Sequence, residues 1–207
     1  MVDGQESILA ERVLGGIPQL TGIMWDKIKL FQEKLNTLEG VMNHEAGAEQ
    51  SEELKETLPL KQHLEGGLYT REIFMPKGMV VVSMIHKQDH PSFVLKGVVS
   101  YLDDKGVVRT VEGPHKIFTK IGTQRVLYIH EDTTWCCVYK TNAKTFEEAE
   151  ADVYTNNYKD LPKKVIKKIK KYGRSRNSSN NWIDRVVSYW LYSSCCRFKC
   201  CFLCSSR

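Results

Sequence analysis

The sequence lacks the signals of a membrane-spanning or secreted protein. It has no run of about 18 apolar residues, so a spanning helix is not expected. Residues 1–10 carry Asp3 and Glu6 and lack the basic start and apolar stretch of a secretory signal. The seven cysteines are odd in number, which argues against a disulfide framework and for a reducing compartment. We therefore expect a protein that is not secreted and lies in the cytoplasm.

Acidic residues are nearly absent from the C-terminal part. Residues 162–207 hold 12 Lys or Arg and one acidic residue, Asp184, whereas residues 1–161 hold 18 basic and 24 acidic residues. Five cysteines also fall within residues 195–207. A basic segment of this kind indicates an anionic partner, either nucleic acid or a membrane surface that it would contact peripherally, or else a solvated extension. Paired cysteines among basic and aromatic residues are also typical of S-acylation near membranes.

The N-terminal part contains one amphipathic pattern. Apolar residues recur at spacings of three and four over residues 20–43, which predicts a helix that covers the rest of the fold or a second subunit. A homo-oligomer formed through this helix is the corresponding expectation. Residues 44–57 are acidic and polar, and they indicate a linker or a short solvated helix.

No helical period interrupts the middle of the chain. Short runs rich in Val, Ile, Tyr and Phe alternate with turn signals, and they predict strands over 68–75, 79–86, 92–102, 107–112, 115–120, 124–130 and 133–140. Strands this close together without helices between them indicate an antiparallel sandwich or barrel. After residue 141 the helical period returns, with an acidic helix expected at 146–154 and a basic amphipathic one at 161–174.

These patterns divide the chain into four parts. They are an N-terminal helical arm and acidic linker (1–56), a β-barrel (57–140), a helical basic extension (141–174) and a Cys-rich tail (175–207). The fold class is therefore expected to be mainly β, a small antiparallel barrel with an N-terminal helix and a basic helical tail.

Three of the six histidines lie at strand ends in the barrel region. His86 ends one predicted strand, His90 follows four residues later, and His130 ends a later strand. Imidazoles from neighbouring strands of a small barrel can converge on one point, where they suit a divalent transition metal. Histidine pairs on surface turns are the alternative.

Two segments around these histidines resemble the motifs of the cupin superfamily. The first is G(78)…H(86)KQDH(90)PSFVLKG(97), and the second is G(122)TQRVLYIH(130)EDTTW. Together with residues 57–77, they look most like the compact cupin-like proteins encoded by tailed bacteriophages. By this resemblance, His86 matches the first motif's opening histidine and His130 the second motif's histidine. His90 lies near the usual glutamate, and Gln88 stands where a second histidine is common.

The resemblance implies a small jelly-roll barrel in which His86, His90 and His130 would bind Zn, Fe, Ni or Mn. It also implies a location in the host cytoplasm or the virion. The protein would be a metal- or small-ligand-binding accessory or virion-associated protein. Alternatively, it would be a metal-dependent enzyme, an isomerase, epimerase or oxygenase, on a small oxygen-rich substrate, with Glu131 or Tyr69 moving protons. The third alternative is a module tethered to membrane or nucleic acid through residues 162–207.

Two strand-borne arginines have two possible orientations. Arg71 and Arg125 lie within predicted strands, where each is either an outward polar residue or an anion contact inside the barrel. The sequence alone leaves this choice open.

Overall fold

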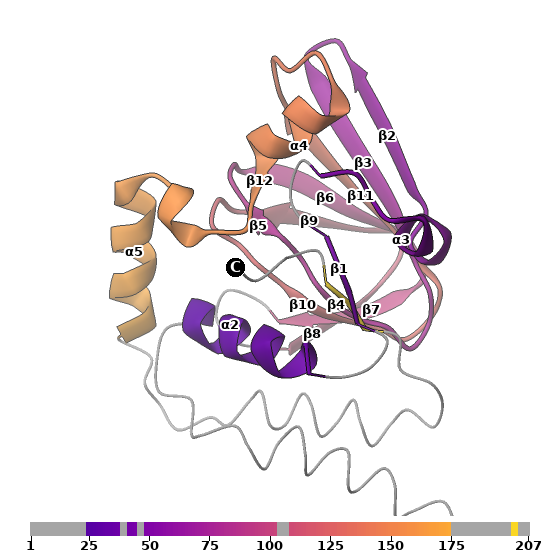
Figure 1. Cartoon of the computed structure of the whole chain (residues 1–207), viewed down its shortest axis with the longest axis horizontal. Helices are drawn as coiled ribbons and strands as arrows, with labels where there is room; N and C mark the ends of the chain where they lie inside the picture. The colour runs from indigo at the N-terminus through magenta and orange to yellow at the C-terminus, as the bar shows by residue number, and fades with distance from the viewer. Residues whose placement is uncertain (1–23, 38–40, 45–47, 103–107, 175–199, 203–207) are drawn as a thin grey trace, which may run out of the picture.

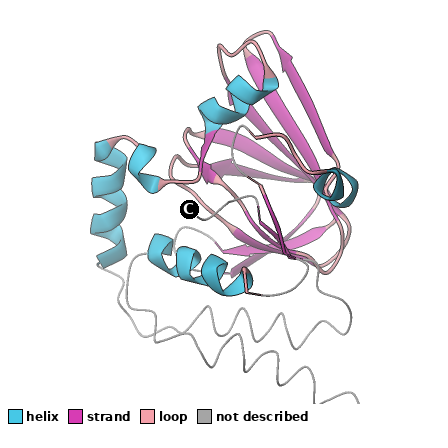
Figure 2. Cartoon of the chain, in the orientation of Figure 1, coloured by secondary structure: helices cyan, strands magenta, loops and turns pink. Residues whose placement is uncertain are grey.

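The computed structural model describes residues 24–37, 41–44, 48–102, 108–174 and 200–202 of the chain. Strands are the commonest regular element of this part, and the helices lie at its periphery (Figure 2). The Cys-rich tail predicted at 175–207 lies outside the described residues, apart from the short strand β13 (Cys200–Phe202).

Eight strands form a jelly roll. They are β3 (Leu68–Met75), β4 (Val80–Val82), β6 (His90–Lys96), β7 (Val98–Leu102), β8 (Val108–Glu112), β9 (His115–Thr119), β10 (Val126–Ile129) and β11 (Thr133–Lys140). In chain order, the first pairs with the last, the second with the seventh, the third with the sixth and the fourth with the fifth, all antiparallel. This nested pairing defines a jelly roll of two facing sheets. The predicted mainly β class with a small antiparallel barrel is thus confirmed.

Further strands extend the two sheets. The first sheet has the order β1-β13-β4-β10-β7-β8, where β1 is Val41–Asn43, and the second has the order β2-β3-β11-β6-β9, where β2 is Leu60–Glu65. A separate two-stranded pair joins β5 (Ile85–His86) to β12 (Tyr154–Thr155). The pair brings a segment from beyond the predicted barrel, at 154–155, against the strand that carries His86.

Helices surround the ends of the barrel. In Figure 1 the two sheets diverge towards the side where α2 (Met24–Leu35), α4 (Phe146–Val153) and α5 (Lys163–Arg174) lie, and α3 (Glu52–Thr57) lies at the other side. A 3-10 helix, η1 (Tyr158–Asp160), precedes α5. No helix in the described part of the chain is long and apolar enough to cross a membrane.

The predicted N-terminal helix is shorter in the structure. Instead of spanning 20–43, helix α2 ends at Leu35, and Val41–Asn43 form strand β1. Met42 is buried in the main core, so its apolar character reflects a strand rather than a helix face. Strand β2, which contains His63, was not predicted either.

Helix α2 packs against the barrel of its own chain. The Trp25 ring stacks on Tyr158 with centroids 3.7 Å apart, and its indole N–H donates to the Gly122 carbonyl at 3.3 Å. Trp25, Ile28, Phe31 and Leu35 are all buried. The apolar side of the helix is therefore used within the chain, and oligomerisation through it stays a prediction.

One glycine in the first cupin-like motif has a clear structural cause. Gly97 joins β6 to β7 with φ +93°, and an added Cβ would lie 2.4 Å from the Asp132 carbonyl oxygen. Only glycine tolerates both that backbone conformation and such a close approach. The motif therefore fixes the sharp step by which the chain crosses from one sheet to the other.

Candidate functional site

The inner face of the β3–β11–β6 sheet changes from apolar to polar along the barrel. Strand β3 alternates, so that its buried residues run Tyr69, Arg71, Ile73 and Met75. Arg71 stands beside Cys137 on β11, which stands beside Ser92 on β6, whereas one row further Ile73, Trp135 and Val94 are neighbours. Because side chains two apart share a face, this pairing gathers polar groups at one end of the interior. We call this region the polar end; its members are Tyr69, Arg71, His86, His90, Ser92, Thr119, Arg125, Tyr139, Glu150 and Tyr154.

His86 and His90 meet at the polar end, as their spacing around a turn suggested. Their ring centroids lie 4.6 Å apart, and both residues are buried. His90 Nδ1 lies 3.1 Å from the Gln88 carbonyl oxygen, so this nitrogen carries the proton and donates. His86 Nδ1 lies 3.0 Å from the Tyr139 hydroxyl, which itself donates to the Tyr154 hydroxyl at 2.7 Å. His86 is therefore the donor to Tyr139.

Burial keeps both imidazoles neutral. It lowers the pKa of His90 to about 4, and the positive charge of Arg125 adds to this effect. Burial also lowers the pKa of His86 well below its ordinary value, helped by His90, Arg125 and Arg71. At neutral pH the polar end thus holds two uncharged rings, and His90 Nε2 presents a lone pair.

Arg71 brings a buried positive charge to the same region. Its Nε lies 3.4 Å from Glu150 Oε1, and His44 Nε2 lies 3.5 Å from the other carboxylate oxygen. The guanidinium also stands over the Tyr154 ring, 5.4 Å from its centroid. Burial acts to lower the pKa of Arg71, but Tyr154 and Glu150 outweigh it and raise the pKa, so the charge is retained. Of the two orientations open from sequence, the structure shows the inward one.

Arg125 also points inward. Its Nη2 donates to Thr119 Oγ1 at 3.1 Å, and the guanidinium stands over the Tyr101 ring at 5.5 Å. Thr119 in turn shares a hydrogen bond with Ser92 at 2.8 Å. The polar end therefore contains two guanidinium groups, those of Arg71 and Arg125, together with the hydroxyls of Ser92 and Thr119.

Among the buried side-chain atoms of the polar end that make no hydrogen bond within the described part of the protein are Arg71 Nη2, a donor, and His90 Nε2, an acceptor. Arg71 is 4% exposed and His90 1% exposed, so bulk water does not serve them. Their strands, β3 and β6, both neighbour β11, which sets their Cα atoms on the order of 12 Å apart on one face.

His130 does not join His86 and His90. The backbone of His86 pairs with Gly122 and Thr123, whereas His130 pairs with Val98 at the far end of β10. His130 lies seven positions beyond Thr123, with strand β10 between them, and an extended chain of that length spans on the order of 20 Å. There His130 Nε2 lies 2.7 Å from the Ser100 hydroxyl, and its ring packs on Tyr128.

The predicted three-histidine metal site is therefore not formed by this geometry. Within the part of the chain that the structure describes, no group of three or more His, Cys, Asp or Glu side chains is placed to hold a metal. His86 and His90 each use Nδ1 in a hydrogen bond, and His130 is remote. The residues that the structure describes do not fit the expected three-imidazole centre.

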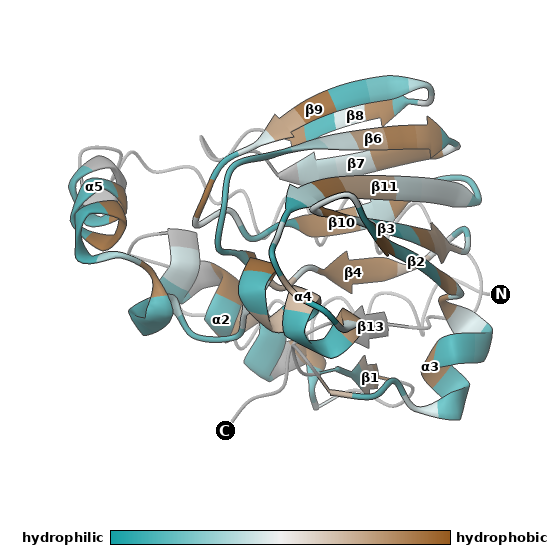
Figure 3. Ribbon diagram, turned by 90° about the horizontal axis from the view of Figure 1, so that it is seen from above, coloured by the Kyte–Doolittle hydropathy of each residue, from teal (hydrophilic) through white to brown (hydrophobic). Residues whose placement is uncertain are grey.

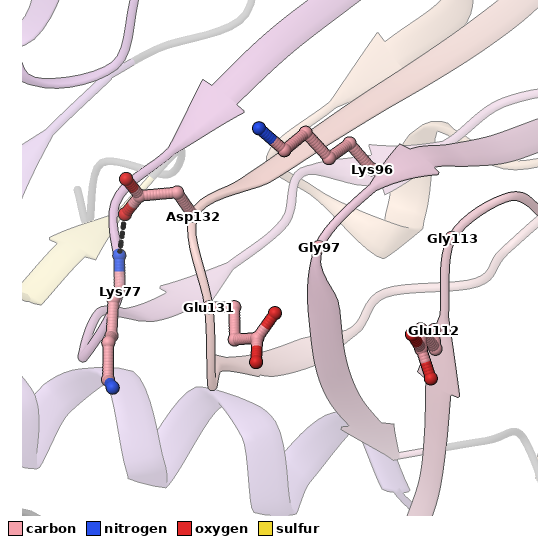
Figure 4. Close-up of a pocket in the computed structure, with 7 residues that line it drawn as sticks. All are labelled: Lys77, Lys96, Gly97, Glu112, Gly113, Glu131 and Asp132. Carbon is pink, nitrogen blue, oxygen red and sulfur yellow. Dashed lines mark hydrogen bonds between the residues drawn. The ribbon is translucent and has the colours of Figure 1, made fainter.

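The two predicted proton-transfer residues lie at opposite ends. Tyr69 is fully buried at the polar end, where its hydroxyl accepts from Gln62 Nε2 and burial raises its pKa. Glu131 lies between β10 and β11, beside a cavity of about 420 Å³ whose other lining residues are Lys77, Lys96, Gly97, Glu112, Gly113 and Asp132 (Figure 4). Glu131 follows His130 directly in the chain and lies at the same end of the barrel. It therefore cannot transfer protons at His86 or His90, which lie at the other end.

Several residues of the polar end were not singled out from the sequence. Tyr139 shares the alternation of β11 with buried Trp135 and Cys137, a signal that was present. For Arg71, whose orientation the sequence left open, the alternation in phase with Tyr69 and Ile73 was the signal for the inward orientation. Glu150 had no such signal, because it stands in an acidic helix that reads as solvated, yet it is buried against Arg71.

Comparison with known proteins adds little to this geometry. No family model and no curated protein sequence matches the chain. Among solved structures, an RmlC-like cupin from Shewanella frigidimarina is similar at 13% identity, covering 42% of this chain and 79% of that one, with a TM-score of 0.37. The cupin_2 domain of an XRE family transcriptional regulator from Enterobacter cloacae is similar at 12% identity, covering 42% and 99%, with a TM-score of 0.36.

A third similar structure is an acetylacetone dioxygenase from Acinetobacter johnsonii, at 13% identity over 40% of this chain and 59% of that one, with a TM-score of 0.34. None of these similarities carries an argument about what this chain binds or does. The jelly-roll assignment rests on the strand pairing of the chain itself.

Proposed function

We propose that this barrel is a binding protein for a small hydroxy-carboxylate, held at the polar end between Arg71 and His90. The observation that carries the proposal is the pair of buried atoms without protein partners, Arg71 Nη2 and His90 Nε2. A buried donor or acceptor without a hydrogen bond costs about 1–3 kcal/mol of folding free energy. A native structure therefore normally supplies a partner for it.

The two atoms together define the ligand chemistry. A guanidinium N–H donates to an anionic oxygen, and carboxylate is its best geometric match. A neutral imidazole nitrogen with a lone pair accepts from a hydroxyl. A molecule that carries both groups a few bonds apart satisfies both atoms at once, whereas a simple carboxylate satisfies one. Ser92 and Thr119 offer further hydroxyls beside it.

Helix α4 and strand β12 cover this site. Glu150 on α4 contacts Arg71, and Tyr154 on β12 receives the Tyr139 hydrogen bond. The carboxylate of Glu150 already shows that Arg71 accepts an anion in this position. A ligand held at this site therefore has to be small.

An accessory or virion-associated role remains part of this proposal. Its support is the resemblance of residues 57–140 to compact phage-encoded cupin-like proteins. A binding role agrees with the separation of Glu131 from Tyr69, because the two predicted proton-transfer residues lie at opposite ends of the barrel.

The test measures ligand-dependent stability of the full chain. We expect glycolate to raise the unfolding free energy by about 2.7 kcal/mol at a hundred times its Kd, with acetate binding more weakly and ethylene glycol not at all. Arg71→Met should abolish the glycolate effect. His90→Phe should remove the preference for glycolate over acetate. Arg109→Met, which removes an exposed arginine on β8, serves as the matched control and should bind as the wild type does.

A destabilised Arg71→Met protein would leave the test open, so Arg71→Met/Glu150→Gln removes both members of the ion pair. If glycolate stabilises this double variant as it does the wild type, the ligand lies elsewhere and the proposal fails. Absence of any effect on the wild type would assign the two atoms to ordered water.

A further inference from the structure

Helix α5 has two chemically different sides. Val165, Ile166 and Ile169 are half-buried against the cluster of Trp25, Ile85 and Leu161. The contact is close, because an added Cβ at Gly122 would lie 2.7 Å from Ile169 Cδ1. The apolar side of α5 is therefore occupied by the barrel end and helix α2.

The other side of α5 is a lysine face. It consists of Lys163, Lys164, Lys167, Lys168, Lys170 and Lys171, all exposed. Figure 3 shows the helix largely in the hydrophilic colour at the edge of the molecule. Among the described residues, none of the six lysines makes an ion pair, and the first turn contains no acidic residue.

This arrangement works against the stability of the helix. Lys163 and Lys167, Lys164 and Lys168, and Lys167 and Lys171 are like charges at i, i+4, and each pair costs about 0.2–0.5 kcal/mol. Two lysines in the first turn also oppose the helix dipole. A bound anion reverses both penalties.

The spacing of the charges matches a polyanion. Residues 163–171 rise on the order of 12 Å along the helix axis, which gives about one positive charge every 2 Å. Double-stranded DNA carries about one negative charge every 1.7 Å. We propose that the lysine face of α5 binds the phosphate backbone of nucleic acid without reading its bases.

The packing of α5 favours nucleic acid over a membrane surface. A helix that lies on a membrane buries its apolar side among the lipids. Here Val165 and Ile169 are committed to Gly122 and its neighbours. The lysine face is left as a purely electrostatic surface, which suits phosphates in water.

The test uses the full chain and two triple variants with equal charge loss. Lys167→Gln/Lys168→Gln/Lys171→Gln alters the lysine face, and Lys77→Gln/Lys116→Gln/Lys144→Gln alters exposed lysines elsewhere. Binding to a fluorescent 20-base-pair duplex is measured between about 50 and 200 mM salt. We expect the α5 variant to lose at least about tenfold in affinity and to reduce the salt slope by about 2 to 3, with less than about twofold loss in the control.

Other outcomes overturn the proposal. Equal losses in the two variants would show that only net charge matters. Wild-type binding to phosphatidylserine vesicles but not to duplex or single-stranded DNA, lost in the α5 variant, would assign the face to membranes. The result is independent of glycolate binding, because neither variant touches the polar end.

Discussion

The polar end of the barrel holds buried groups whose protonation is restricted by their surroundings. His90 packs against Tyr139 with ring centroids 4.1 Å apart and against His86 at 4.6 Å. Because burial opposes the charged form, both rings stay neutral in the folded state. This restriction ties the stability of the fold to pH.

We expect the unfolding free energy to fall as pH drops from about 6.5 to about 4. In that window the unfolded chain binds protons that His90, with a pKa lowered to about 4, does not bind in the folded state. The contribution is complete above pH 6.5 and amounts to about 3 kcal/mol. Urea unfolding across the window measures it, and His90→Gln should make the curve less steep, with the remaining slope due to His86, whose pKa is also lowered by burial.

His63→Gln is the matched control, since His63 is exposed on β2. It should leave the pH dependence unchanged. A curve for His90→Gln that coincides with the wild type would show that His90 takes up its proton normally in the folded chain.

At the scale of elements, Trp25 makes the most specific contacts between helix α2 and the end of the barrel, beside the buried Ile28, Phe31 and Leu35. Trp25 combines stacking on Tyr158 with a hydrogen bond to Gly122, and Gly122 also contacts Ile169 of α5. Both helices thus meet at one turn of the barrel. Docking of α2 should therefore depend strongly on the indole.

Trp25→Ala should lower the unfolding free energy by about 3–5 kcal/mol and expose α2 to limited proteolysis, because it leaves a cavity and an unmade hydrogen bond. Trp25→Phe keeps a stacking ring but loses the indole hydrogen bond. It should lower the unfolding free energy by about 1 kcal/mol in addition to the effect of its smaller ring. Asp26→Ala, at an exposed position of the same helix, is the control. Equal protease resistance in Trp25→Ala and the control would contradict the docking.

For the whole molecule, the two ends of the barrel are chemically separate. The polar end contains His90, and the opposite end contains His130, Glu131 and a cavity lined by charged residues. A metal shared by His90 and His130 would couple them, whereas the geometry places them on the order of 20 Å apart.

A double-mutant cycle separates the two cases. For His90→Gln and His130→Gln we expect the changes in unfolding free energy to add within about 0.5 kcal/mol. For His90→Gln and Tyr139→Phe, whose rings touch, we expect coupling of about 0.5–3 kcal/mol. Strong coupling between His90 and His130 would restore the three-histidine site.

The local patterns of the sequence determined several of the strands and the two histidines that meet, but they merged β6 and β7 into one predicted strand over 92–102 and missed β2. Alternation predicted β3 and β11 at their observed bounds, because side chains on a strand face opposite ways. The short separation of His86 and His90 brought them together around one turn. Helix α2 was overextended, since Met42 is apolar in a strand as it would be in a helix.

Only the tertiary structure decided which strand ends share an end of the barrel. His86 and His130 are each the last residue of a predicted strand. In the antiparallel arrangement, however, the C-terminal ends of β5 and β10 lie far apart. The tertiary structure also brought Arg71 against Glu150, which lies on a helix that no local pattern placed beside the barrel. These contacts depend on strand register and on how the connections cross between the sheets, and they join residues far apart in the sequence. The pattern of a short stretch of residues therefore does not predict them.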